Sequence, residues 1–179
     1  MKMRRTMLYV PGNNPAMLQN AGIYGADSLL LDLEDAVSVT EKDSARYLVA
    51  NMMKIIDFGR SEVVVRINPL DTDFGRDDLE IIVPLKPTGG LRVPKTSCAK
   101  DIKLLDEVLS EIEEKNGMEV GSTKVMAMLE TALGVSRAYE VATASERVTA
   151  ITFGAEDFTA DMGIRRSTEG KELFTPRSE

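Results

Sequence analysis

Six short apolar runs recur along the chain and predict six β-strands. They are rich in leucine or β-branched residues, and most lack the alternation of polar and apolar residues that is typical of a half-exposed strand. We therefore predict parallel strands that are buried on both faces. The runs are MLYV (7–10), SLLLDL (28–33), EVVVRI (62–67), GLRVP (90–94), KVMAML (124–129) and VTAITF (148–153).

Helical patterns lie between these runs. The first, residues 40–56, opens with Thr40 three residues before Asp43, a spacing similar to that of a capping box. The second, residues 97–117, has apolar residues on one stripe, has charged residues elsewhere and ends at an Asn-Gly pair. A shorter helix is predicted over residues 132–145.

Alternating strands and helices indicate an α/β fold, for which two architectures compete. An open doubly wound sheet would be favoured by a GxGxxG fingerprint, which is absent. Polar residues at successive strand ends favour a TIM (β/α)8 barrel, because such barrels gather their active sites there. No linker divides residues 1–179, so a single domain is expected. A complete barrel has eight strands in about 250 residues, whereas this chain is expected to form about six β/α units. The chain is therefore a fragment of a barrel, a barrel that something else closes, or a sheet that does not close.

The composition excludes some classes of protein and limits the groups that could act in catalysis. A net charge of −7 argues against a general nucleic-acid binder, and no apolar run is long enough to span a membrane. A single cysteine suits a reducing cytoplasm. The chain has no histidine, so any catalysis must use carboxylates, Arg, Lys or a metal ion.

Two of the apolar runs end on an acid, Glu130 after one and Asp157 after the next. Ends of adjacent parallel strands lie about 5 Å apart, so the two carboxylates could share one Mg²⁺ ion, which prefers oxygen ligands. The alternative is that each acid caps the helix that follows it.

Other charged residues also follow predicted strands. Arg66 could hold a substrate carboxylate, or it could pair with an acid of the second strand. Asp32 and Glu34 point to the same face, where they could orient metal-bound waters or Arg66, unless they simply meet solvent. Lys95 could meet a phosphate or a developing negative charge, although a lone lysine in a loop is also often just exposed.

Taken together, six segments resemble the HpcH/HpaI aldolase and citrate lyase β-subunit superfamily, and they occur in the same order. The longer stretches 23–46 and 154–170 are similar to citrate lyase β subunits in particular. The resemblance covers essentially the whole chain. The segments are RTMLYVPGNNPAML, LLLDLEDAV, VVVRIN, LRVPKT, MLETALGV and FGAEDFTADMG.

The resemblance implies a TIM barrel and assigns roles to residues. Glu130 and Asp157 match the family's Mg²⁺ ligands, and Arg66 matches the arginine that holds the substrate. In relatives, an arginine near the first strand and a basic residue after the fourth lie near the thioester arm. These correspond to Arg5 and Lys95.

The resemblance also implies a reaction and partners. Citrate lyase β subunits cleave citryl-acyl carrier protein to acetyl-acyl carrier protein and oxaloacetate. They work with an α subunit that transfers the acyl group and a γ subunit that is the carrier protein, and a homo-oligomer is expected. A stand-alone lyase of CoA thioesters, or a malate-synthase-like relative, is the alternative enzyme.

The chain stops where relatives continue into strands seven and eight. In relatives those strands close the barrel and contribute to the thioester site. A third hypothesis therefore stands beside the two enzymes: a non-catalytic assembly module that keeps the metal site.

Overall fold

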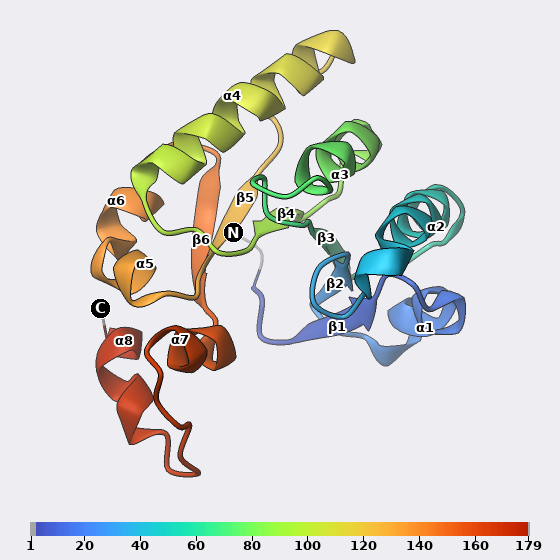
Figure 1. The fold of residues 1–179 in the computed structure, drawn as a ribbon. Helices are drawn as coiled ribbons and strands as arrows, with labels where there is room; N and C mark the ends of the chain where they lie inside the picture. Colours follow the sequence, from blue (N-terminus) through green and yellow to red (C-terminus); the bar gives the residue numbers. More distant parts are fainter. Residues whose placement is uncertain (1–2, 179) are drawn as a thin grey trace.

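The computed structural model describes residues 3–178 and contains one sheet of six strands, each parallel to its neighbours (Figure 1). The strands lie in the order β1-β2-β3-β4-β5-β6. A doubly wound sheet reverses its order at a switch point, and this sheet does not. The strands are β1 (Met7–Pro11), β2 (Ser28–Asp32), β3 (Glu62–Arg66), β4 (Gly90–Val93), β5 (Val125–Leu129) and β6 (Val148–Phe153).

All six predicted strands are confirmed to within one residue at each end. The connections between them are helical. The α-helices are α1 (Pro15–Asn20), α2 (Lys42–Ile55), α3 (Gly75–Ile82), α4 (Ala99–Lys115), α5 (Ala132–Ser136), α6 (Ala138–Ala142), α7 (Ala155–Asp161) and α8 (Phe174–Ser178). Short 3₁₀ turns are η1 (Ala21–Tyr24), η2 (Val39–Glu41), η3 (Val83–Leu85) and η4 (Lys171–Leu173).

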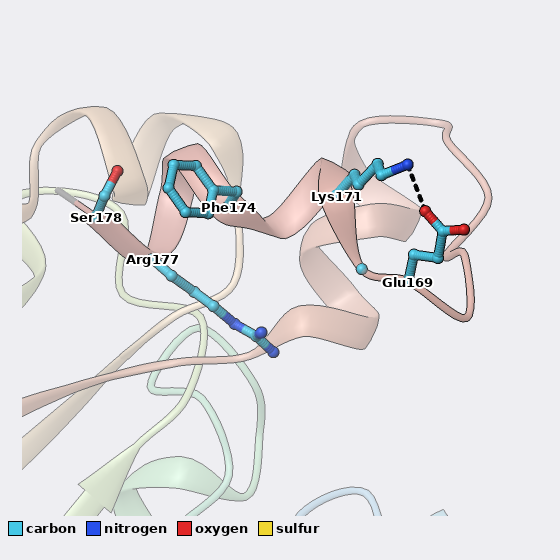
Figure 2. Close-up of a pocket in the computed structure, with 6 residues that line it drawn as sticks. Glu169, Lys171, Phe174, Arg177 and Ser178 are labelled. Carbon is cyan, nitrogen blue, oxygen red and sulfur yellow. Dashed lines mark ion pairs between the residues drawn. The ribbon is translucent and has the colours of Figure 1, made fainter.

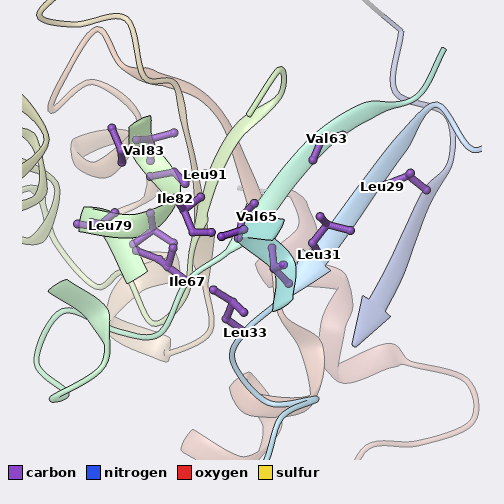
Figure 3. Packing of buried hydrophobic residues seen from close by; sticks show 14 of the residues in the cluster. Leu29, Leu31, Leu33, Val63, Val65, Ile67, Leu79, Ile82, Val83 and Leu91 are labelled. Atoms are coloured by element: carbon purple, nitrogen blue, oxygen red, sulfur yellow. The ribbon is translucent and has the colours of Figure 1, made fainter. Parts of the chain in front are cut away.

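The two faces of the sheet are covered differently. Alternate residues of each strand point outward and pack under α2, α3 and α4, so that Leu31, Val65 and Ile67 lie near Leu79 and Ile82 of α3 (Figure 3). The opposite face carries a small separate cluster of strand residues: Leu30, Val64 and Met126, with Met7 and Ala150 beside them. Helices on one face and strand side chains on the other are the arrangement of a barrel wall.

The edge strands depart from the prediction that all strands are buried on both faces. In β2 to β5 every residue is buried, whereas β6 alternates between half-buried and exposed residues, and Ile151 is 39% exposed. Each edge strand has a hydrogen-bonded neighbour on one side only.

Within residues 3–178 we find no helix with the length and apolar character needed to cross a bilayer.

The predicted helix over residues 132–145 is wrong as a single element. It breaks at Arg137, whose φ of −114° and ψ of 20° leave the helical region. The two halves dock separately. Gly134 of α5 lies against the loop after β4, where a Cβ atom would be 2.7 Å from the carbonyl oxygen of Thr96, and Val141 of α6 is buried in the core.

The predicted capping box at Thr40 and Asp43 is also wrong. The 3₁₀ turn η2 precedes α2, and Glu41 occupies the N-cap without a side-chain cap. The Thr40 hydroxyl lies 3.3 Å from that of Ser38 instead. A capping box does occur at α4, where Cys98 and Asp101 exchange side-chain and backbone contacts.

Candidate functional site

Charged residues that follow β2 and β3 form a buried ion-pair cluster. Arg66 Nε and Nη2 donate to the two carboxylate oxygens of Asp32 at 2.7 and 2.5 Å. Arg66 Nη1 lies 2.9 Å from Glu34 Oε2 and 3.5 Å from Asp35 Oδ2. The guanidinium also lies over the ring of Tyr9, 5.6 Å from its centroid. The expected pairing of Arg66 with acids of the second strand therefore occurs.

Asp32 and Glu34 do not meet solvent, since they are only 1% and 3% exposed. Burial raises the pKa of Glu34 to about 7, although the Arg66 cation opposes the shift. Lys95 Nζ lies 3.6 Å from Glu34 Oε1, and the Lys95 side chain is 51% exposed. Lys95 has a φ of +52°, in the left-handed region, so the loop after β4 holds this residue in an uncommon conformation.

Glu130 is 3% exposed at the end of β5, and its Oε2 accepts a hydrogen bond of 2.8 Å from the Lys95 backbone N–H. Burial raises the pKa of Glu130, the Lys95 N–H opposes this, and the charge of nearby Asp157 raises the pKa further. Glu130 does not cap the following helix. Thr131 does, because its side chain accepts from the Gly134 N–H.

Asp157 lies in the first turn of α7, half-buried and close enough to Glu130 for their charges to repel. Gly154 packs directly against the Glu130 side chain, because a Cβ atom there would lie 2.6 Å from Glu130 Cγ and 2.7 Å from Oε1, so a residue with a side chain would displace the carboxylate. Two hard oxygen donors close to each other fit a Mg²⁺ ion, which commonly takes one or two carboxylates and completes its shell with other oxygens. Residues 3–178 contain no cluster of three or more Cys, Asp or Glu that could enclose a metal.

The structure does not bring Arg5 to this cluster. It lies two residues before β1, and its Nη2 is 2.8 Å from Oδ1 of Asp27, which precedes β2. The pair therefore sits at the amino ends of the strands, whereas Glu130 and Arg66 sit at the carboxyl ends. The position of Arg5 before the predicted first strand already indicated the amino end, and the correspondence taken from the resemblance did not use it.

Sequence reasoning missed Lys42, which holds the loop after β2 in place. Its Nζ donates to the carbonyl oxygens of Leu33 at 2.8 Å and of Glu34 at 2.5 Å. Burial lowers the pKa of Lys42, although the surrounding carboxylates oppose this. A lysine at the start of a helix ordinarily suggests solvent exposure, so nothing in the pattern pointed to this contact.

Two hollows lie near the chain surface. One of about 300 Å³ borders Lys95 between the loops after β3 and β4 and is lined in part by Leu70 and Asp101. Another, of about 580 Å³, lies on the segment before and within α8, where Lys171 and Glu169 form an ion pair (Figure 2). Neither hollow is lined by Glu34, Glu130 or Asp157, but the first adjoins this cluster through Lys95. We therefore place the candidate site at the carboxyl ends of the strands.

Comparison with known proteins shows which family the chain belongs to. Two curated relatives are citrate lyase β subunits: one from Leuconostoc mesenteroides subsp. cremoris, 48% identical over 177 residues, and one from Haemophilus influenzae, 47% identical over 177 residues. Each alignment covers 99% of this chain but only 58% and 60% of the relative. The chain thus spans about three-fifths of the length of these relatives.

A solved structure has the same fold. The citrate lyase β subunit of Mycobacterium tuberculosis, complexed with oxaloacetate and magnesium, superposes with a TM-score of 0.75 at 28% identity and covers 99% of this chain and 74% of that one. The family model described as HpcH/HpaI aldolase/citrate lyase matches residues 5–179. With almost the whole sequence matched and the barrel-wall fold shared, the chain belongs to the HpcH/HpaI aldolase/citrate lyase family.

Proposed function

We propose that this chain carries the lyase site of a citrate lyase β subunit and cleaves citryl-acyl carrier protein to acetyl-acyl carrier protein and oxaloacetate with Mg²⁺. The observation that supports this most is the buried Glu130 carboxylate, which the Lys95 N–H and the close approach of Gly154 hold in place, with the Asp157 carboxylate nearby. The similarity to citrate lyase β subunits points to the same reaction.

Glu130 and Asp157 would hold the metal, which supplies Lewis-acid polarisation of the substrate oxygens when bound. The reaction breaks the bond between the hydroxyl-bearing carbon and the methylene carbon next to the thioester. The hydroxyl loses its proton as oxaloacetate forms, and the thioester enolate then takes up a proton. No histidine is available to accept the hydroxyl proton. Glu34 suits that role, because burial raises its pKa to about 7.

Arg66 would lie at the substrate side of the cluster, held in a fixed orientation by the two oxygens of Asp32. A guanidinium fixed in this way can stabilise negative charge without reorganising during the reaction. Lys95, half-exposed at the mouth and next to the 300 Å³ hollow, is placed to meet an anionic part of the thioester arm. Arg5 is left out of this site because it lies at the other end of the strands.

The test is oxaloacetate release from a citryl thioester by this chain, with and without Mg²⁺. Glu130→Gln keeps the shape of the side chain but removes its charge, and we expect at least about a 100-fold loss of rate, since Lewis-acid stabilisation is worth several kcal/mol. Glu140→Gln, at an exposed position of α6, is the matched control and should keep the full rate. Release that does not depend on Mg²⁺ or on Glu130 would refute the proposed site.

An acyl carrier protein and an acyl-transferring α subunit are the partners we infer, in the cytoplasm, because the named relatives are β subunits of citrate lyase. We also infer that several copies of this chain associate with one another. A second candidate function is cleavage of a CoA thioester. It is favoured by 34% identity over 171 residues to L-malyl-CoA/β-methylmalyl-CoA lyase of Cereibacter sphaeroides. Comparing the rates with carrier-protein and CoA thioesters separates the two. Mg²⁺ binding without cleavage of either, together with tight binding to the α subunit, would instead indicate the assembly module.

A further inference from the structure

Arg92 is an exception among the buried arginines. Four arginines within residues 3–178 are buried, and three of them form ion pairs with carboxylates. Arg92, which is 4% exposed, has no carboxylate within ion-pair distance in the described part of the chain. Its Nε is buried and has no hydrogen-bond partner. Leaving a buried charge unpaired is costly, so such a group requires an explanation.

The neighbours of Arg92 are weak or neutral acceptors. Its Nη1 donates to the Tyr9 hydroxyl at 2.9 Å, and its Nη2 lies 3.7 Å from the Met126 sulfur. Neither contact supplies negative charge. Burial lowers the pKa of Arg92 and the Arg66 cation lowers it further, whereas the contact with Tyr9 and the charge of Glu130 oppose the shift.

The register of the sheet places Arg92 directly beside the candidate site. Asp32 pairs with Arg66 across β2 and β3, and Arg66 pairs with Arg92 across β3 and β4. Two arginines at directly opposed positions repel each other. Asp32 and Glu34 neutralise Arg66, whereas Arg92 remains uncompensated. An anion bound beside Arg92 would relieve both the desolvation and the repulsion.

Arg92 also lies on the inner face of the sheet, where a substrate would enter. Its Tyr9 contact joins β4 to β1, two strands that are not neighbours in the sheet, so both side chains reach across the inner face. Tyr9 contacts Arg92 and is 43% exposed, so the Tyr9 side chain connects the buried Arg92 to the solvent-accessible surface. Arg66, by contrast, already has three carboxylates around it.

We infer that Arg92 binds the second carboxylate of the four-carbon oxaloacetate unit and so selects it over the three-carbon pyruvate unit, which lacks that group. The inference rests on the proposed lyase function. In the proposed reaction the carboxylate next to the reacting carbon would lie near Glu130 and Asp157. The distant carboxylate then needs an unpaired cation on the inner face, and Arg92 is the buried one that the described residues offer. Arg92 acts here as a specificity residue.

The experiment measures binding of L-malate and L-lactate to this chain with Mg²⁺. These stable hydroxy acids differ by the one carboxylate in question. The wild-type chain should bind malate at least about tenfold more tightly, because a charge-assisted hydrogen-bonded pair is worth 1.4 kcal/mol or more. Arg92→Gln should remove that preference and leave lactate binding within about twofold.

Arg92→Lys keeps the charge without the planar fork, so it should retain part of the preference for malate even if the glutamine variant folds poorly. Tyr9→Phe removes a neighbour of Arg92 but no charge, and it should keep the preference. Equal affinity of the wild-type chain for the two acids, or an unchanged preference in a folded Arg92→Gln variant, overturns the inference. The Glu130→Gln variant should bind neither malate nor lactate. Loss of binding of both acids therefore indicates failure of the metal site, whereas loss of the preference for malate alone indicates failure at Arg92.

Discussion

At the scale of single residues, three of the four buried arginines within residues 3–178 are neutralised in specific pairs with carboxylates. Asp32 places both oxygens on Arg66, and neither side chain is more than 8% exposed. Removing one member of a buried pair leaves the other without compensation, which costs more than the pair itself contributes. The strand-end cluster is therefore a sensitive point for stability as well as for function.

Asp32→Asn should lower the free energy of unfolding by about 3–5 kcal/mol, because it leaves Arg66 with weaker partners. Urea denaturation measures this, and Asp73→Asn, at an exposed loop position, is the matched control. A loss no larger than that of the control would show that Glu34 alone neutralises Arg66.

A second buried pair lies at the amino ends of the strands. Arg147 Nη1 and Nη2 donate to the two oxygens of Glu113 at 2.9 and 2.8 Å, and Glu113 is fully buried. Burial by itself would raise the pKa of Glu113, but hydrogen bonds from Arg147 and Thr123 outweigh it and lower the pKa from 4.5 to about 2. Because the pKa is lower in the folded state, ionised Glu113 stabilises the fold above about pH 4.5, and this contribution disappears as the pH falls to about 2.

Glu113→Gln should therefore destabilise the protein most at neutral pH, by about 3–5 kcal/mol. The difference from wild type should shrink as the pH falls from 4.5 toward 2. Urea denaturation at several pH values measures it, with Glu114→Gln, exposed on the same helix, as the control. A difference that does not change with pH would contradict the assigned pKa.

At the scale of elements, the apolar stripe in the sequence of α4 determines which face of the helix packs against the sheet. Its stripe of Ile102, Leu105, Leu109 and Ile112 is buried against the sheet, while Leu104 on another face is 51% exposed. The helix also has its own start signal, since Asp101 accepts from the backbone N–H of Cys98. Its amphipathic stripe packs the helix against the core, and the buried Glu113–Arg147 pair adds a charged contact near its C-terminal end.

Leu109→Ala should lower the free energy of unfolding by about 2–5 kcal/mol, through lost burial and the cavity that remains. Leu104→Ala makes the same chemical change at an exposed site and should cost less than about 1 kcal/mol. Thermal and urea unfolding of the two variants compares them. Equal losses would mean that α4 is not packed by the stripe described.

At the scale of the whole molecule, the fold is one curved parallel sheet with its helices on the outer face (Figure 1). The charged residues of the candidate site lie at the carboxyl-end rim of this sheet. The contact between Tyr9 and Arg92 crosses the inner face and joins strands far apart in the sheet. A ligand at the rim would contact several β/α units at once, so its binding should stabilise the whole fold.

Mg²⁺ should accordingly raise the melting temperature of the wild-type chain. At a concentration 100 times its Kd, an ion that binds only the folded state adds about 2.7 kcal/mol. Glu130→Gln should show little of this stabilisation, whereas Glu140→Gln should keep it. Differential scanning calorimetry across a Mg²⁺ series measures the effect, and equal shifts in both variants would place the ion elsewhere.

The sequence by itself determined the strands and the kind of chemistry. Apolar runs long enough for a strand, with no alternation, have few stable environments other than a buried parallel sheet, so their number and bounds could be predicted. Carboxylates directly after such runs must then lie at one rim. The absence of histidine restricted the chemistry to carboxylates, Arg, Lys and a metal ion.

Only the tertiary structure decided which charges meet and which remain unpaired. The break at Arg137 arises because α5 and α6 dock at different places, and the partner of Arg5 is Asp27 because parallel pairing brings the residues before β1 and β2 together. Whether an arginine has a carboxylate partner depends on the register and curvature of the sheet, which involve strands far apart in sequence. Arg66 and Arg92 both sit within short β-strands, yet only the folded sheet distinguishes the neutralised arginine from the free one.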